Sequence, residues 1–224
     1  MHVGIIGSGI VAQTIGAKLV EHGEDVVLGT RSPENLDHKR GMGGTLGDWV
    51  AKTNNKAKIV TFAEAAMHGE IVINATAGTG SLEALTLAGA QNLDGKILID
   101  ISNPLDFSKG MPPTLTVCNT DSVSEQIQRA FPNAHVVKTL NTTNANVMVD
   151  PKSVAGGDHH MFVCGNDAAS KGRVSDLLRS WFGWEHIIDL GNISNARGME
   201  MILPIWIRLR VALGTPMFNF KIAR

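Results

Sequence analysis

Residues 2–31, HVGIIGSGIVAQTIGAKLVEHGEDVVLGTR, form the stretch that decides the fold. An apolar run from Val3 to Ile6 leads into the sequence GSGIVA at 7–12, which fits the pattern G-x-G-x-x-[G/A]. An apolar helical pattern follows and stops at Gly23, and a second apolar run occupies 26–28. A strand, a glycine turn, a helix and a second strand in this order are the context in which the pattern predicts a dinucleotide-binding fold.

Each small residue of this turn has a steric reason to be there. Gly7 permits the tight turn, Gly9 lets the backbone approach a diphosphate, and Ala12 lets the helix pack closely on the sheet. The first turn of the helix directs unpaired N–H groups and a partial positive charge toward the phosphates. A glycine turn without a ligand is the alternative. We predict that the diphosphate is bound by Gly7, Ser8, Gly9, Ile10, Val11 and Ala12.

The end of the second strand indicates which dinucleotide is preferred. A site for NAD places Asp or Glu there to bind the ribose 2′-hydroxyl, whereas this chain has Thr30, Arg31 and Ser32. A guanidinium can form paired hydrogen bonds with phosphate oxygens, and hydroxyl groups can donate further ones. The sequence therefore predicts NADP rather than NAD, unless Arg31 is only a solvated loop residue.

The rest of the chain alternates between apolar runs and helical patterns, which predicts an α/β fold with a doubly wound, mostly parallel sheet. Strands are expected at 58–61, 70–74, 96–101, 135–138, 160–164 and 185–190, and helices at 45–52, 62–68, 81–91, 122–130 and 168–182. The polar connection 33–44 is expected to lie beside the adenine, and 107–120 is expected to be a surface loop. We assign 1–190 to a Rossmann domain and 191–224 to a small helical extension.

Two polar or small clusters follow strands and so should lie on the ligand-binding edge of the sheet. Ala75, Thr76 and Ala77 follow one strand, where a nicotinamide ribose should lie. Asn141 and Thr142 belong to an amide-rich and hydroxyl-rich stretch after another strand. This stretch could hydrogen-bond a carboxamide or a ring edge, or it could simply cap a helix.

Composition excludes several classes of function. A net charge of −1 argues against nucleic acid as the main partner. Two cysteines, Cys118 and Cys164, give no disulfide framework, and both are expected to be buried. With no signal peptide, the expected compartment is the cytoplasm. The apolar run 201–207 is too short to span a membrane, and Pro204 should interrupt its helix.

The C-terminal segment adds a resemblance to a known family. GNISNAR at 191–197, followed by MILP at 201–204, resembles the closing helix of the NADP oxidoreductases that use the deazaflavin coenzyme F420. GSGIVA, GTRS, VVKTLNTTNANVMVDP and FVCGNDAASK agree with the same family. The resemblance covers nearly the whole chain, and membrane-bound ferric reductases share the same domain.

The resemblance implies a Rossmann domain of about eight strands. It also implies a C-terminal helical part that helps form the acceptor pocket, and often a homodimer. The implied reaction is hydride exchange between NADP(H) and a flat ring, either a deazaflavin (coenzyme F420) or a flavin. One departure is Ser32, where the family often has a second basic residue. The family positions matched in this chain are Gly7, Gly9, Val11, Ala12, Thr30, Arg31, Ser32, Ala75, Thr76, Ala77, Asn141 and Thr142.

Hydride transfer between two rings needs little from side chains, because the cofactors carry the chemistry. Accordingly, we predict no catalytic residue and no metal site. Two alternatives remain, a non-catalytic NADPH-binding redox sensor and a reductase of small carbonyls or imines. The sensor should have the slot over the nicotinamide filled by 195–220. The reductase needs a proton donor, for which the candidates are Lys138, His159 and His160.

Overall fold

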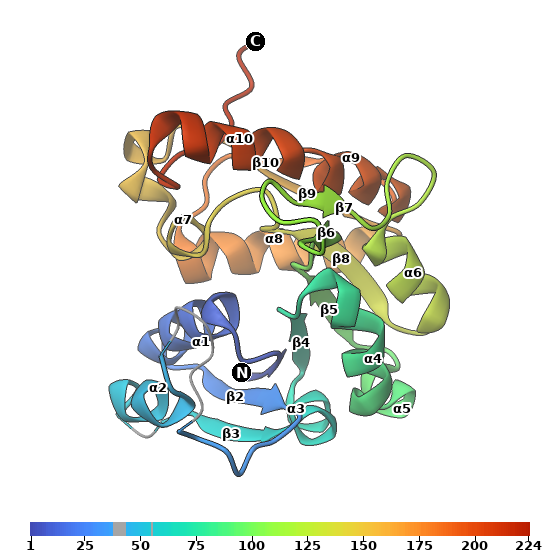
Figure 1. The fold of residues 1–224 in the computed structure, drawn as a ribbon. Helices are drawn as coiled ribbons and strands as arrows, with labels where there is room; N and C mark the ends of the chain where they lie inside the picture. Colours follow the sequence, from blue (N-terminus) through green and yellow to red (C-terminus); the bar gives the residue numbers. More distant parts are fainter. Residues whose placement is uncertain (38–43, 55) are drawn as a thin grey trace.

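An eight-stranded sheet with the strand order β10-β9-β8-β5-β4-β1-β2-β3 organises the molecule (Figure 1). The computed structural model describes residues 1–37, 44–54 and 56–224. The neighbouring strands of this sheet are parallel, except for the antiparallel pair β8 and β9. The strands are β1 (His2–Ile6), β2 (Asp25–Thr30), β3 (Lys58–Thr61), β4 (Ile71–Asn74), β5 (Ile97–Asp100), β8 (His135–Thr139), β9 (Met161–Gly165) and β10 (Ile187–Asp189).

Helices connect successive strands and cover both faces of the sheet. Within the Rossmann part these are α1 (Ile10–Glu21), α2 (Leu46–Lys52), α3 (Phe62–His68), α4 (Gly78–Ala88), α5 (Ala90–Leu93), α6 (Val123–Ala130), α7 (Ala145–Val149) and α8 (Ala168–Phe182). Short 3-10 turns occur at η2 (Pro151–Ser153), η3 (Ala155–Gly157) and η4 (Ile193–Asn195). The chain closes with α9 (Ala196–Met201) and α10 (Leu203–Leu213).

The buried side chains form two core clusters, one on each face of the sheet. Ile5 of β1 packs in the cluster that contains residues of α1 and α8. Its neighbour Ile6 packs in the other cluster, with residues of α3, α4 and α6. Successive side chains of a strand point to opposite faces, so these central strands must be apolar throughout. The doubly wound fold predicted from the alternating pattern is confirmed.

The ends of the helices follow from local sequence. Thr61 and Glu64 form a capping box at the start of α3, in which each side chain binds the other residue's backbone N–H. At α8, the Asp167 side chain accepts from Ser170 N–H, and Gly183 ends the helix with φ of 82°. These signals explain why the predicted helices at 62–68 and 168–182 agree with the structure at both ends.

Several expectations about individual segments are wrong. The stretch 107–120 is not only a loop, because β6 (Leu105–Asp106) and β7 (Thr114–Leu115) pair as a small antiparallel hairpin. The helix expected to begin at Ser81 begins at Gly78 instead. Cys118 is exposed rather than buried. Half of the connection 33–44, residues 38–43, lies outside the described residues.

The C-terminal segment packs on the side of the molecule formed by β8, β9 and β10, away from β2 and β3 (Figure 1). As expected, the helix is interrupted at Pro204: α9 ends at Met201, and Pro204 lies in the first turn of α10, where its missing N–H is tolerated. The tail then returns to β9, since His160 N–H donates to the Phe220 carbonyl over 2.9 Å. None of the helices in the described ranges is long and apolar enough to cross a membrane.

Candidate functional site

The glycine turn between β1 and α1 is shaped by two glycines with different roles. Gly7 has φ of +120°, and a Cβ added to it would lie 2.8 Å from the Ala75 carbonyl oxygen, so the fold itself requires glycine. Gly9 precedes α1 with φ of −76°, and a Cβ added to it would meet no described atom within 4 Å. The fold therefore leaves room at Gly9, directly at the N-terminus of α1.

A cavity of 490 Å³ opens beside this turn, at the carboxyl ends of β1, β4 and β5. The residues that line it come from the glycine turn, the loop after β4, the loop after β5 and the β6–β7 hairpin: Gly9, Ile10, Val11, Ala75, Thr76, Ala77, Thr79, Ile101, Ser102, Asn103, Leu105 and Phe107. The structure thus brings together two of the clusters predicted from the sequence. Ser102 and Asn103, which follow β5, join them.

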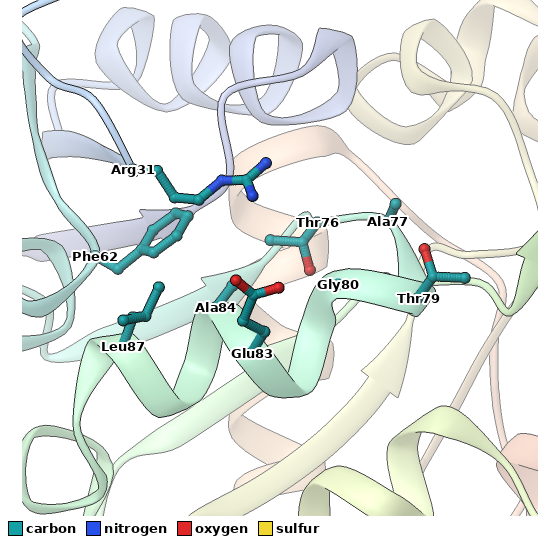
Figure 2. A pocket seen from close by; sticks show the side chains of 9 residues that line it. All are labelled: Arg31, Phe62, Thr76, Ala77, Thr79, Gly80, Glu83, Ala84 and Leu87. Carbon is teal, nitrogen blue, oxygen red and sulfur yellow. The ribbon is translucent and has the colours of Figure 1, made fainter.

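A second cavity, of 240 Å³, shares Thr76, Ala77 and Thr79 with the first and extends to Arg31. Figure 2 shows the Arg31 side chain passing the Phe62 ring, with its guanidinium directed into the space above Thr76. Phe62 and Leu87 give this cavity apolar walls, and Glu83 adds a carboxylate. The sequence interpretation missed these three residues, because all of them lie on helices and no motif marks them.

The remaining residues of the predicted dinucleotide site lie around these cavities rather than in their walls. Thr30 is buried at the end of β2, and Ser32 is half-buried in the following loop. Ala12 is fully buried in the core on the α1 side of the sheet. Gly7 and Ser8 form the turn itself, and Gln13 Nε2 donates to the Ser8 carbonyl over 3.0 Å.

The loop after β4 is held by a buried network of polar side chains. Asn74 Nδ2 donates to Asp100 Oδ1 over 2.8 Å and to Ser81 Oγ over 3.1 Å. Thr76 Oγ1 donates to Asn74 Oδ1 over 2.7 Å. Ser81 therefore lies inside α4 and supports the loop, and the hydroxyl of Thr76 is already hydrogen-bonded to Asn74.

Asn141 connects the site to the C-terminal segment. Its Nδ2 donates to Asn103 Oδ1 over 2.9 Å and to the Met199 carbonyl over 2.8 Å, although the side chain is only 1 % exposed. The helix cap considered for this stretch belongs to a neighbour, Asn144, whose Oδ1 accepts from the first N–H groups of α7. Thr142 is fully buried and lines neither cavity.

Three polar atoms near this point are buried without a hydrogen-bond partner among the described residues: Ser102 Oγ, Asn141 Oδ1 and Thr142 Oγ1. Buried polar atoms are normally paired, and an unpaired one costs about 1–3 kcal/mol. Ser102 lines the larger cavity. Of the three, Ser102 is the residue that lines a cavity, so its unpaired hydroxyl is the one placed to meet a polar ligand group such as a carboxamide.

Lys138 cannot serve as the proton donor considered above, because it is a structural residue. Its Nζ is fully buried and lies 2.9 Å from Asp100 Oδ2 and 2.9 Å from Glu200 Oε1. Burial alone would lower the pKa of Lys138, but the two carboxylates outweigh it, so the pKa is raised and the charge is retained. This ion-pair network ties α9 to the ends of β5 and β8.

The two histidines considered as donors are also held by structural contacts. His159 Nε2 lies 2.9 Å from the Pro151 carbonyl, and its Nδ1 lies 2.8 Å from Asn219 Nδ2. His160 Nδ1 accepts from the Ile222 N–H over 3.2 Å. Neither histidine lines the two cavities described above.

Known proteins are similar to this chain in sequence and in architecture. The family model for coenzyme F420-dependent NADP oxidoreductases matches residues 2–104. A solved structure from Arthrobacter sp. FB24, provisionally named an F420-dependent NADP reductase, is 53% identical to this chain, covers 100% of both chains and has a TM-score of 0.95. The chain belongs to the F420-dependent NADP oxidoreductase family.

Two curated relatives show how widely this domain is used. The F420-dependent NADP reductase of Methanocaldococcus jannaschii is 31% identical over 66% of this chain and 65% of its own length. Metalloreductase STEAP3 of Rattus norvegicus is 30% identical over 95% of this chain. The chain spans only 39% of the length of the metalloreductase.

Proposed function

We propose that the protein is an oxidoreductase that transfers a hydride between NADP(H) and a planar ring, which is the deazaflavin coenzyme F420 or a flavin. The observation that carries this proposal is the pair of adjoining cavities along the carboxyl edge of the sheet. The smaller cavity contains Arg31, and the larger one contains the open Gly9 turn and Ser102, whose hydroxyl is unpaired. NADP(H) carries a 2′-phosphate, a diphosphate and a nicotinamide carboxamide, and these groups suit Arg31, the Gly9 turn and Ser102, respectively.

The residues of the site fit NADP(H) in three parts. Arg31, with Thr30 and Ser32, would bind the 2′-phosphate, and Phe62 and Leu87 would border the adenine. The N–H groups at the start of α1, from Ile10 to Ala12, would face the diphosphate. Ala75, Thr76 and Ala77 would border the nicotinamide ribose. We assign Asn141 and Thr142, which are buried and line neither cavity, to the nicotinamide side.

When bound, the nicotinamide supplies or accepts the hydride, and the protein's part is to position two rings in contact and to keep water away. Asn141 is held by Asn103 and Met199, and through its hydrogen bond it orients Asn103, which lines the larger cavity. Leu105 and Phe107 form an apolar wall on the side where a second ring could lie. The C-terminal segment 191–224 supports the site through Met199 and Glu200, and we propose that it borders the acceptor.

The acceptor is tested by mixing the protein and NADPH with coenzyme F420, FMN, FAD, a quinone or a ferric chelate, and following the loss of nicotinamide absorbance. We expect the fastest oxidation with the deazaflavin, a slower one with flavins and little with a chelate. Absence of turnover with every acceptor, together with tight NADPH binding, would favour the redox sensor. Turnover of a small ketone or imine would favour the third alternative, for which none of the three candidate proton donors lines the cavities.

A homodimer is the assembly that we propose for this chain. α10 exposes Ile205, Val211 and Leu213 by 49 %, 74 % and 56 %. A further cavity of 440 Å³ lies between α10 and the Met111–Pro112 loop, and Met111 is 66 % exposed. Exposed apolar side chains of this size are typical of a protein interface.

A further inference from the structure

A cluster of two histidines and one aspartate lies at the edge of the sheet opposite the proposed NADP(H) site. His2 begins β1, Asp25 begins β2 and His68 ends α3. His2 Nδ1 lies 2.8 Å from Asp25 Oδ2, and His68 Nε2 lies 3.6 Å from the same oxygen. One ligand atom from each residue lies within 4.8 Å of the other two.

These distances suit a shared metal ion. Four ligand atoms at about 2.0–2.2 Å from a tetrahedral Zn²⁺ are roughly 3.3 Å from one another. The distances from Asp25 Oδ2 to His2 Nδ1 and to His68 Nε2, 2.8 Å and 3.6 Å, lie on either side of that value. The two imidazole rings meet edge to face with centroids 4.9 Å apart. His68 is half-buried and its Nε2 also lies 3.2 Å from the Asp25 carbonyl oxygen, whereas His2 and Asp25 are exposed, so binding an ion requires His68 to exchange that contact and the other two side chains to turn toward it.

The charge around the cluster also favours a cation. Glu70 Oε1 accepts from the His2 N–H over 3.1 Å, and Glu24 Oε2 binds the N-terminal ammonium of Met1 over 2.6 Å. Together with Asp25, this patch contains three carboxylates and one ammonium, which gives a negative local potential. A divalent ion would reduce the repulsion among these carboxylates.

We propose that His2, Asp25 and His68 bind one divalent first-row transition-metal ion of the Zn²⁺ class. Two imidazoles with one carboxylate favour such an ion over Mg²⁺ or Ca²⁺, which prefer oxygen ligands. Three protein ligands leave the remaining positions to water. An ion bound here joins β1, β2 and α3, and so links elements of the sheet to a helix on one of its faces.

The site is too far from the proposed NADP(H) site to take part in hydride transfer. β1 runs from His2 to Ile6 and leads directly into Gly7. Five residues of strand, at about 3.3 Å each, separate the two ends by roughly 16 Å. The ion is therefore assigned a stabilising role, and its binding can be tested independently of the reaction.

The test uses chelator-treated full-length protein with a free, untagged N-terminus, titrated with Zn²⁺ by calorimetry and with Co²⁺ by visible absorption. We expect one ion per chain, a Co²⁺ spectrum that indicates nitrogen ligands, and a higher melting temperature with Zn²⁺. His68→Ala and Asp25→Asn should each weaken binding at least tenfold and abolish the thermal shift. His22→Ala, which removes a nearby exposed imidazole, should change neither.

The proposal is overturned if His68→Ala and Asp25→Asn bind Zn²⁺ as tightly as the unaltered protein, or if the unaltered protein shows no saturable binding below millimolar Zn²⁺. Circular dichroism of the metal-free variants confirms that both are folded. NADPH affinity provides a second control. It should be the same with and without Zn²⁺, since the two sites lie at opposite edges of the sheet.

Discussion

At the scale of single residues, substitution of the two glycines of the first turn should have opposite effects on stability and on NADPH affinity. Gly9→Ala adds a methyl group to open space, so the free energy of unfolding should change by less than about 1 kcal/mol, while NADPH affinity should fall at least tenfold. Gly7→Ala forces a side chain to adopt φ of +120° against the Ala75 carbonyl, and should destabilise the fold by about 1–3 kcal/mol.

Thermal unfolding and NADPH titration measured on both variants separate these effects. Gly172→Ala, at an open position inside α8, is the control: it should leave NADPH affinity unchanged and should stabilise the fold by about 0.5–1 kcal/mol. Equal loss of stability in Gly9→Ala and Gly7→Ala would contradict the assignment of Gly9 to the ligand.

Arg31 decides the preference between the two dinucleotides in our proposal. Arg31→Ala should weaken NADPH binding by about 1–3 kcal/mol, the range for a charge-assisted hydrogen bond, and NADH binding much less. Dissociation constants for both nucleotides, measured by fluorescence, give the comparison. Arg173→Ala, on the exposed side of α8, is the matched control. If Arg31→Ala lowered both affinities equally, the 2′-phosphate would have to bind elsewhere.

At the scale of elements, the buried ion-pair network determines how α9 attaches to the sheet. Lys138→Met leaves Asp100 and Glu200 buried without their cation, and breaking a buried pair in this way costs about 3–5 kcal/mol. Urea unfolding should show this loss. Lys18→Met breaks a surface pair with Glu21 and should cost less than about 1 kcal/mol. A similarly small effect at Lys138 would show that the network is dispensable.

The start of α6 carries a pH-dependent contact. Hydrogen bonds from Arg129 lower the pKa of Asp121 from 3.8 to about 2. Because the folded-state pKa is the lower one, the contact stabilises the fold fully above pH 3.8, and this stabilisation is lost as pH falls toward 2. Asp121→Asn should therefore cost about 1 kcal/mol at pH 7, a small value because water screens the exposed Arg129.

Urea unfolding at pH 7 and at pH 3 provides the measurement for Asp121. The difference between Asp121→Asn and the unaltered protein should be largest at pH 7 and smaller at pH 3. A difference that grows on acidification would have the wrong sign for this ion pair and would exclude it as the cause.

At the scale of the whole molecule, the exposed face of α10 predicts self-association. Light scattering coupled to size exclusion should give a mass near twice 23.9 kDa. Val211→Glu places a charge in that face and should yield the monomer, because burying an unpaired carboxylate opposes association. Met67→Glu alters another exposed apolar residue, on α3, and should leave the mass unchanged. A monomeric unaltered protein would contradict the proposed dimer.

The sequence by itself determined the fold class, the dinucleotide turn and the bounds of helices such as α8. Each of these depends on signals close together in the chain: G-x-G-x-x-A after an apolar run, or Asp167 and Gly183 at the ends of one amphipathic segment. The position of Arg31 near the site also follows from a local signal, because Arg31 comes directly after the second apolar run, which forms β2 beside β1.

Only the tertiary structure decided what the polar residues contact. Lys138 meets Asp100 and Glu200, which are 38 and 62 residues away, so its role as a buried cation has no local signal. The link from Asn141 to Met199 and the cluster of His2, Asp25 and His68 depend in the same way on elements distant in sequence. Periodicity and turns report the local backbone, whereas burial and pairing depend on which distant segments the sheet brings together.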